Sequence, residues 1–226
     1  MKAVSKKLLS LLLPCIFALL QVNAQQKTTG KISLKKMLQE NKVTTVNRTA
    51  SPLPEDAGYQ GIHLDEKPGS GFVWLNDSQF GNGTIKMRLK GKDVLQRSFI
   101  GIAFHAANDS TFDAIYFRPF NFRSTDSIRR SHSVQYVSYP GYEWDVLRKD
   151  FPGKYEHDVQ PVPDPNGWFL MSVEIDYPHI KVYVDKAATP SLVIKQLSKQ
   201  RNGKIGLMTG NNSGGDFADL EINARK

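Results

Sequence analysis

The chain has 226 residues, of which 40% are hydrophobic, 23% charged and 10% aromatic. These fractions are those of an ordinary globular domain and exclude a disordered, collagen-like or multi-spanning membrane protein. The formal net charge is +8, and it falls to +5 (27 basic minus 22 acidic residues) when the three lysines among the first 24 residues are set aside. A charge this small does not indicate a nucleic-acid partner.

The first 24 residues have the organisation of a secretory signal peptide. A basic start is followed by the apolar run 8–20 and by Val22-Asn23-Ala24, a small-x-small cleavage site. The run is too short to span a bilayer, so no transmembrane segment is predicted. We therefore expect export to the periplasm or the medium. The only cysteine, Cys15, lies inside the run, where it could alternatively carry a lipid anchor.

The remainder divides into a polar N-terminal segment, residues 25–56, and a longer part, residues 57–226. The polar segment ends in the breaker Ser51-Pro52-Leu53-Pro54, and residues 35–38 within it suit either a helical turn or a first strand. The longer part is predicted to be one folded domain.

Residues 84–90 give the clearest strand pattern of the chain, because apolar and polar, mostly basic, side chains alternate there with a period of two. This alternation is typical of an antiparallel strand with one face on a core and the other in water. Ile85, Met87 and Leu89 are therefore expected to point inward.

Other segments read as short strands bounded by turn residues. Residues 98–105 and 112–117 are separated by Asn108-Asp109-Ser110 and are expected to form a hairpin. Further candidates are residues 133–139, 168–176, 180–185, 192–197, 204–209 and 217–222. About ten strands with almost no helical periodicity predict an all-β sandwich of two antiparallel sheets in a single domain.

The C-terminal third has a recognisable order of strands. Trp168 opens a strand, and the segments KVYVD (181–185), GKIGLMTG (203–210) and DFADLEI (216–222) follow. This order resembles the closing strands of the concanavalin A-like jelly roll, which laminin-G-like modules, bacterial lectin-like domains, family 16 glycoside hydrolases and the 3-keto-disaccharide hydrolase group share. The resemblance implies the fold of residues 57–226 and an exported bacterial protein, but that fold hosts both binders and enzymes.

The family 16 resemblance fails at its catalytic motif. Those enzymes carry Glu-x-Asp-x-x-Glu on one strand, whereas here Glu143-Trp144-Asp145 is followed by Val146, Leu147 and Arg148. The last carboxylate of the motif is therefore missing.

Residues 116–144 depart from an ordinary sandwich, because eight of these 29 positions are aromatic and basic side chains lie between them. Aromatic faces cover the C–H surfaces of sugars, and arginine offers a rigid fork to carboxylate or sulfate groups. If Ile115 and Phe117 face the core, Tyr116 and Arg118 face outward. The predicted ligand-binding residues are Tyr116, Arg118, Arg123, Arg129, Arg130, Tyr136, Tyr142 and Trp144.

An alternative interpretation of the same segment is structural. The aromatic side chains would pack beneath a long crossover, and the arginines would form ion pairs with Asp145, Asp150, Glu156 or Asp158. The sequence leaves both interpretations open.

Cofactor chemistry has little support in the sequence. The five histidines show no metal-ligand spacing, so no metal-binding residues are predicted. The resemblance to jelly rolls allows a structural calcium, for which the oxygen donors would be Asn108, Asp109, Asn211, Asn212, Asp216 and Asp219. The same residues are ordinary turn formers.

Three functions therefore stay open. The first is an exported carbohydrate-binding jelly roll that holds a glycan on an arginine- and aromatic-lined face. The second is a glycoside hydrolase of the same fold, similar to the 3-keto-disaccharide hydrolase group, in which Glu143, Asp145 and His132 would do the acid-base work. The third is a structural or protein-interaction module of the laminin-G-like kind.

Overall fold

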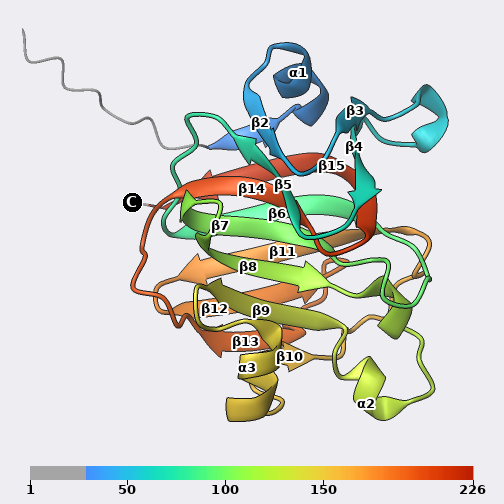
Figure 1. Cartoon of the computed structure of the whole chain (residues 1–226), viewed down its shortest axis with the longest axis vertical. Helices are drawn as coiled ribbons and strands as arrows, with labels where there is room; N and C mark the ends of the chain where they lie inside the picture. The colour runs from blue at the N-terminus through green and yellow to red at the C-terminus, as the bar shows by residue number, and fades with distance from the viewer. Residues whose placement is uncertain (1–28, 226) are drawn as a thin grey trace, which may run out of the picture.

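The computed structural model describes residues 29–225, and the predicted signal peptide at 1–24 lies outside the described residues. Within residues 29–225 the chain forms two antiparallel sheets that pack face to face, with a few short helices at the ends (Figure 1). The predicted class, an all-β sandwich in a single domain, is confirmed. No helix of this part is long and apolar enough to cross a membrane.

The larger sheet has eight strands in the described chain, seven of them in a continuous order, with β1 (Gly30–Ile32) paired additionally to β15. In spatial order the seven are β13 (Leu192–Lys195), β12 (His179–Val184), β11 (Trp168–Asp176), β6 (Gly83–Lys90), β15 (Ser213–Ala224), β4 (Gly61–Lys67) and β3 (Ala50–Pro52).

The smaller sheet has seven described strands. In spatial order they are β10 (Glu156–His157), β9 (Val134–Tyr139), β8 (Thr111–Phe117), β7 (Ile100–Asn108), β14 (Lys204–Thr209), β5 (Gly71–Leu75) and β2 (Val43–Val46). The helices of the described part are α1 (Leu34–Gln39), α2 (Ser127–Arg130) and α3 (Trp144–Asp150), and short 3-10 turns lie at Glu55–Ala57 and Pro119–Asn121.

The core lies between the two sheets, as the alternation of buried and partly buried side chains along β6 shows. Ile85, Met87 and Leu89 are fully buried, as predicted, while the residues between them are only partly buried. On the smaller sheet β7 and β8 form the predicted hairpin, with Ile102 opposite Ile115 in the register. The two sheets bury these apolar rows against each other, which is the dominant stabilising contribution in such a sandwich.

The N-terminal segment belongs to the sandwich. Its strands β1 and β3 join the larger sheet and β2 joins the smaller one, so the folded unit extends from residue 30 and does not begin at residue 57. Residues 34–39 adopt the helical alternative and form α1, which begins at the N-cap Ser33.

A buried arginine attaches this segment to the C-terminal strands. Arg48 donates hydrogen bonds from Nε to Thr209 Oγ1 (2.8 Å) and from Nη2 to the carbonyl oxygens of Gly69 and Gly210 (2.7 Å each). These bonds hold the connection between β14 and β15 in place, next to the cavity described below.

Gly101 allows β7 and β8 to approach each other closely. It lies opposite Tyr116 on β8 and Met208 on β14, on the outer face of the smaller sheet. A Cβ atom at this position would lie 2.1 Å from the carbonyl oxygen of Ile115 and 2.6 Å from Cα of Tyr116. Because both contacts are with backbone atoms, a larger residue cannot be accommodated by a rotamer change alone.

We therefore predict that Gly101→Ala lowers the free energy of unfolding by about 1–3 kcal/mol, the usual range for overpacking. Urea denaturation monitored by circular dichroism measures this directly. An unchanged unfolding midpoint would contradict the close contact between β7 and β8.

Candidate functional site

The outer face of the smaller sheet carries a cavity of about 650 Å³, a size that suits a small-molecule or sugar ligand. Side chains alternate between the two faces of a strand. Ile115 and Phe117 are fully buried in the core, so Tyr116 between them points to the outer face and lines the cavity. The residues that line the cavity are Ser70, Leu95, Gln96, Phe99, Tyr116, Arg118, Phe120, Asn121, Arg129, His132, Tyr139, Trp144, Arg148, Met208, Gly210, Asn211 and Asn212.

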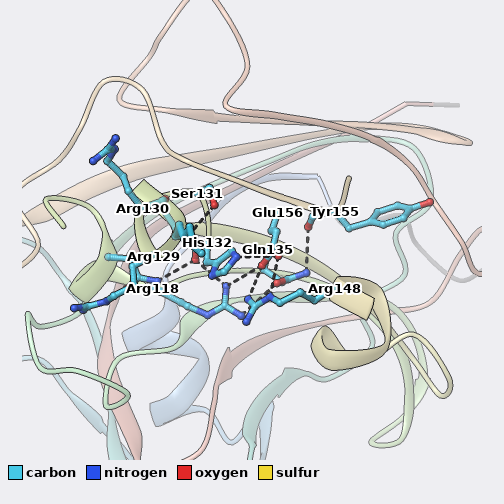
Figure 2. A network of polar contacts seen from close by, with 12 residues as sticks. Arg118, Arg129, Arg130, Ser131, His132, Gln135, Arg148, Tyr155 and Glu156 are labelled. Atoms are coloured by element: carbon cyan, nitrogen blue, oxygen red, sulfur yellow. Dashed lines mark hydrogen bonds and ion pairs between the residues drawn. The ribbon is translucent and has the colours of Figure 1, made fainter. Parts of the chain in front are cut away.

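A buried carboxylate organises the polar side of this cavity. Glu156, on the edge strand β10, is 4% exposed. Its two oxygens accept hydrogen bonds from Nε (2.9 Å) and Nη2 (2.7 Å) of Arg148 on α3, which is the bidentate geometry that guanidinium and carboxylate groups favour. Nε2 of His132 lies 3.3 Å from Oε1 of the same carboxylate. Figure 2 shows these groups converging.

Arg118 lies in the same network and is 5% exposed. Its Nη1 donates to the carbonyl oxygen of His132 (2.8 Å), and its Nη2 donates to the hydroxyl of Tyr116 (2.8 Å) and to Oε1 of Gln135 (3.3 Å). Its distance to the Glu156 carboxylate, 3.9 Å from Nη1 to Oε2, is longer than the distances made by Arg148. Arg118 therefore hydrogen-bonds mainly to neutral oxygen atoms.

Aromatic rings surround these charges. The Arg118 guanidinium lies 4.9 Å from the ring centre of Tyr116 and 5.7 Å from that of Phe99. Arg148 lies 5.1 Å from the ring of Trp144, which is 47% exposed at the rim of the cavity. Burial raises the pKa of the Tyr139 hydroxyl to about 12, so this group is a neutral hydrogen-bond donor at physiological pH.

The environment of His132 favours the neutral form of its imidazole. Burial lowers the pKa of its imidazole below the ordinary 6.5, and the positive charges of Arg148 and Arg118 act in the same direction against the opposing effect of Glu156. The imidazole lines the cavity and can therefore accept or donate a hydrogen bond to a ligand.

The structure brings five of the predicted site residues to the cavity. These are Tyr116, Arg118, Arg129, His132 and Trp144. For Arg118 the alternative, structural interpretation also applies in part, because its guanidinium packs on aromatic rings and lies within ion-pair distance of Glu156.

Other predicted residues do not line the cavity. Tyr136 faces the core and is fully buried, and its hydroxyl donates to Oδ1 of Asp113 at 2.5 Å. Arg130 donates to the carbonyl oxygen of Ser124 and extends away from the network (Figure 2). The other residues of this group are Arg123, Tyr142, Glu143 and Asp145, of which Glu143 lies at the start of α3 and is hydrogen-bonded by the backbone N–H of Gly141.

The site also contains residues that sequence reasoning did not assign to it. In the sequence Arg148 stands where the family 16 motif has its last carboxylate, and Glu156 is one of four acids that could pair with the arginines, so neither is among the predicted site residues. Tyr139 lines the cavity and Gln135 accepts a hydrogen bond from Arg118, and neither is among the predicted ligand-binding residues. A basic residue on the helix after an aromatic-rich segment was the signal that could have indicated Arg148.

The oxygen donors considered for calcium are dispersed in the structure. Asn108 caps the turn between β7 and β8, Asn211 accepts the N–H of Gly69, Asp216 pairs with His63 and Asp219 pairs with Arg88. In residues 29–225 no three His, Cys, Asp or Glu side chains form a metal-binding cluster. The calcium site stays a prediction.

Comparison with known proteins supports the fold. The chain matches no protein-family model, and a search of curated proteins finds no match. Among solved structures, the carbohydrate-binding module CBM66 from Bacillus subtilis superposes with a TM-score of 0.59 at 14% identity, covering 81% of this chain and 96% of that one.

Two further solved structures have the same architecture. A proposed glycosyl hydrolase from Parabacteroides distasonis gives a TM-score of 0.57 at 11% identity and covers 88% of this chain and 100% of its own. The exoplasmic/lumenal domain of VIP36, in a form bound to Ca²⁺ and Man3GlcNAc, gives 0.52 at 12% identity, with coverages of 86% and 88%. At these identities the similarity shows a jelly-roll fold and no more.

We predict that Glu156→Gln lowers the free energy of unfolding by about 3 kcal/mol, because it leaves the buried guanidinium of Arg118 and its neighbour Arg148 without their shared carboxylate. The control Glu143→Gln removes an acid outside the network and is expected to change stability by less than about 0.5 kcal/mol. Urea denaturation at neutral pH compares the two. Equal stability of both variants would contradict the role given to Glu156.

The lowered pKa of His132 predicts a pH dependence. Below about pH 6.5 the unfolded chain binds a proton at His132 more readily than the folded chain does. The free energy of unfolding is therefore higher above that pH and decreases as the pH falls. Between about pH 7.5 and 5.5 the wild type should therefore lose more of its free energy of unfolding than His132→Gln does. A larger loss in the variant would contradict the direction of the shift.

Proposed function

We propose that this protein is an exported carbohydrate-binding jelly roll and that the cavity on the outer face of the smaller sheet holds the glycan. The observation that carries the proposal is the composition of the cavity wall. Exposed Trp144 and the ring of Tyr139 lie beside guanidinium, imidazole and amide groups within one concave site. Sugars are recognised by this combination of flat apolar surfaces and directional hydrogen-bonding groups.

The similar structures support the same class of ligand. CBM66 is by its name a carbohydrate-binding module, and the VIP36 domain is described in a form bound to Man3GlcNAc. The signal-peptide pattern of residues 1–24 supports export. N-terminal sequencing of the secreted or periplasmic protein tests that part of the proposal, since a chain beginning near Gln25 is expected.

The second candidate function is glycoside hydrolysis, which the similarity to the Parabacteroides protein favours. The usual mechanism needs two carboxyl groups across the scissile bond. Among the described residues that line the cavity there is no Asp or Glu, and Glu156 beneath it is engaged by Arg148 in a bidentate pair. We therefore rank binding above hydrolysis.

The proposal predicts that Trp144→Ala weakens glycan binding at least about tenfold, equivalent to 1.4 kcal/mol, because it removes the exposed stacking surface. Tyr142→Ala is the matched control, since Tyr142 is an exposed aromatic residue nearby that does not line the cavity. Affinities are measured by calorimetry with the best ligand found on an array of neutral and acidic glycans.

Mass spectrometry of the same incubations tests the second function. Intact glycans together with Trp144-dependent binding support the binding protein. Cleavage products would make the protein an enzyme, and equal losses in the Trp144 and Tyr142 variants would remove the cavity from the proposal.

A further inference from the structure

The walls of the cavity carry an excess of positive charge. Arg118, Arg129 and Arg148 line it together with His132, and within residues 29–225 the lining contains no acidic side chain. A neutral sugar needs hydrogen-bonding groups but no such accumulation of charge. The charge therefore requires an explanation beyond the binding of a glycan as such.

The carboxylate beneath the cavity compensates only part of this charge. Glu156 is held by Arg148 at 2.7 and 2.9 Å, whereas Arg118 approaches it no closer than 3.9 Å. Two guanidinium groups thus share one carboxylate, and the formal net charge of these three groups is +1. Since Arg118 is 95% buried and hydrogen-bonded mainly to neutral oxygens, its field is weakly screened by water and reaches into the cavity.

Two of the arginines keep donor groups for a ligand. Arg148 uses Nε and Nη2 for Glu156, which leaves its Nη1. Arg129 makes one long side-chain hydrogen bond, from Nη2 to the carbonyl oxygen of Phe120 at 3.4 Å. The nearby acid Asp126 uses its Oδ1 to cap α2 by accepting backbone N–H groups, including that of Arg129.

A buried acceptor lies in the same wall. Asn121 is 4% exposed, its Nδ2 donates to the carbonyl oxygen of His132, and its Oδ1 has no hydrogen-bond partner. Buried polar atoms without a partner are rare and call for a specific reason. A hydroxyl group of a bound ligand would provide that partner.

Resting on the proposed function, we propose that the glycan is anionic, and that its carboxylate or sulfate ester lies against Arg129 and Arg148 while a hydroxyl meets Asn121. Trp144 packs on the apolar face of the same sugar. Arginine suits this task because its planar fork matches both anionic groups.

The test uses calorimetry on the purified protein with matched pairs of oligosaccharides. Oligomers of galacturonate, mannuronate and glucuronate are each compared with their methyl esters, and sulfated galactans are compared with their desulfated forms. We expect one anionic oligomer to bind at least about tenfold more tightly than its neutral partner, and this difference in affinity should decrease as ionic strength rises. A difference between a uronate oligomer and its methyl ester identifies a uronate ligand. A difference between a sulfated galactan and its desulfated form identifies a sulfate ester.

Two variants locate the effect. Arg129→Gln should reduce the preference for the anionic partner at least about fivefold, because it removes one direct donor and one charge. Arg123→Gln removes the same charge from an exposed position outside the cavity and should leave the preference unchanged. Equal effects of the two variants would overturn the inference.

The outcomes separate this inference from the proposed function. Neutral and anionic partners that bind equally, with dependence on Trp144, would overturn the anionic preference and leave glycan binding in place. No binding by either member of any pair would overturn both.

Discussion

A single buried carboxylate holds the polar half of the cavity together. Glu156 sits on the short edge strand β10 and engages Arg148 from α3, with His132 and Arg118 from the segments beside α2 and β8 around it. These residues come from separate segments between positions 118 and 156, and the buried Arg118 and Glu156 would be costly to bury without polar partners. Arg118 completes the network over the ring of Tyr116, where hydrogen bonds to the Tyr116 hydroxyl and the His132 carbonyl oxygen hold it.

The smaller sheet forms the surface on which this cluster lies. Along the outer face of the smaller sheet, Gly101 and Ala103 lie opposite Tyr116 and Ala114 in the register, so small side chains alternate with a large one. The segments that follow β8 and β9 then bring Arg129 and Trp144 to the rim. A rigid sheet thus positions groups that come from loops and short helices, which is the usual division between scaffold and site.

Local patterns explain how much the sequence could predict. The period of two in β6 and the turn residues between β7 and β8 identify strands whose side chains face a core, and alternation also places Tyr116 on the outer face. The same reasoning could not exclude Tyr136, because the face that a strand turns to the core depends on the neighbouring strands. Glu156 and Arg48 lie outside any periodic segment, and only the tertiary structure shows what they contact.

The central claim is that the outer face of the smaller sheet, at Trp144 and its arginine neighbours, is where a glycan binds. Nuclear magnetic resonance of the ¹⁵N-labelled protein, titrated with a mixture of neutral and acidic oligosaccharides, tests it residue by residue. We predict that the indole signal of Trp144 and the side-chain Nε signals of Arg129 and Arg148 shift together on titration. Shifts confined to the larger sheet, with these three signals unmoved, would contradict the account.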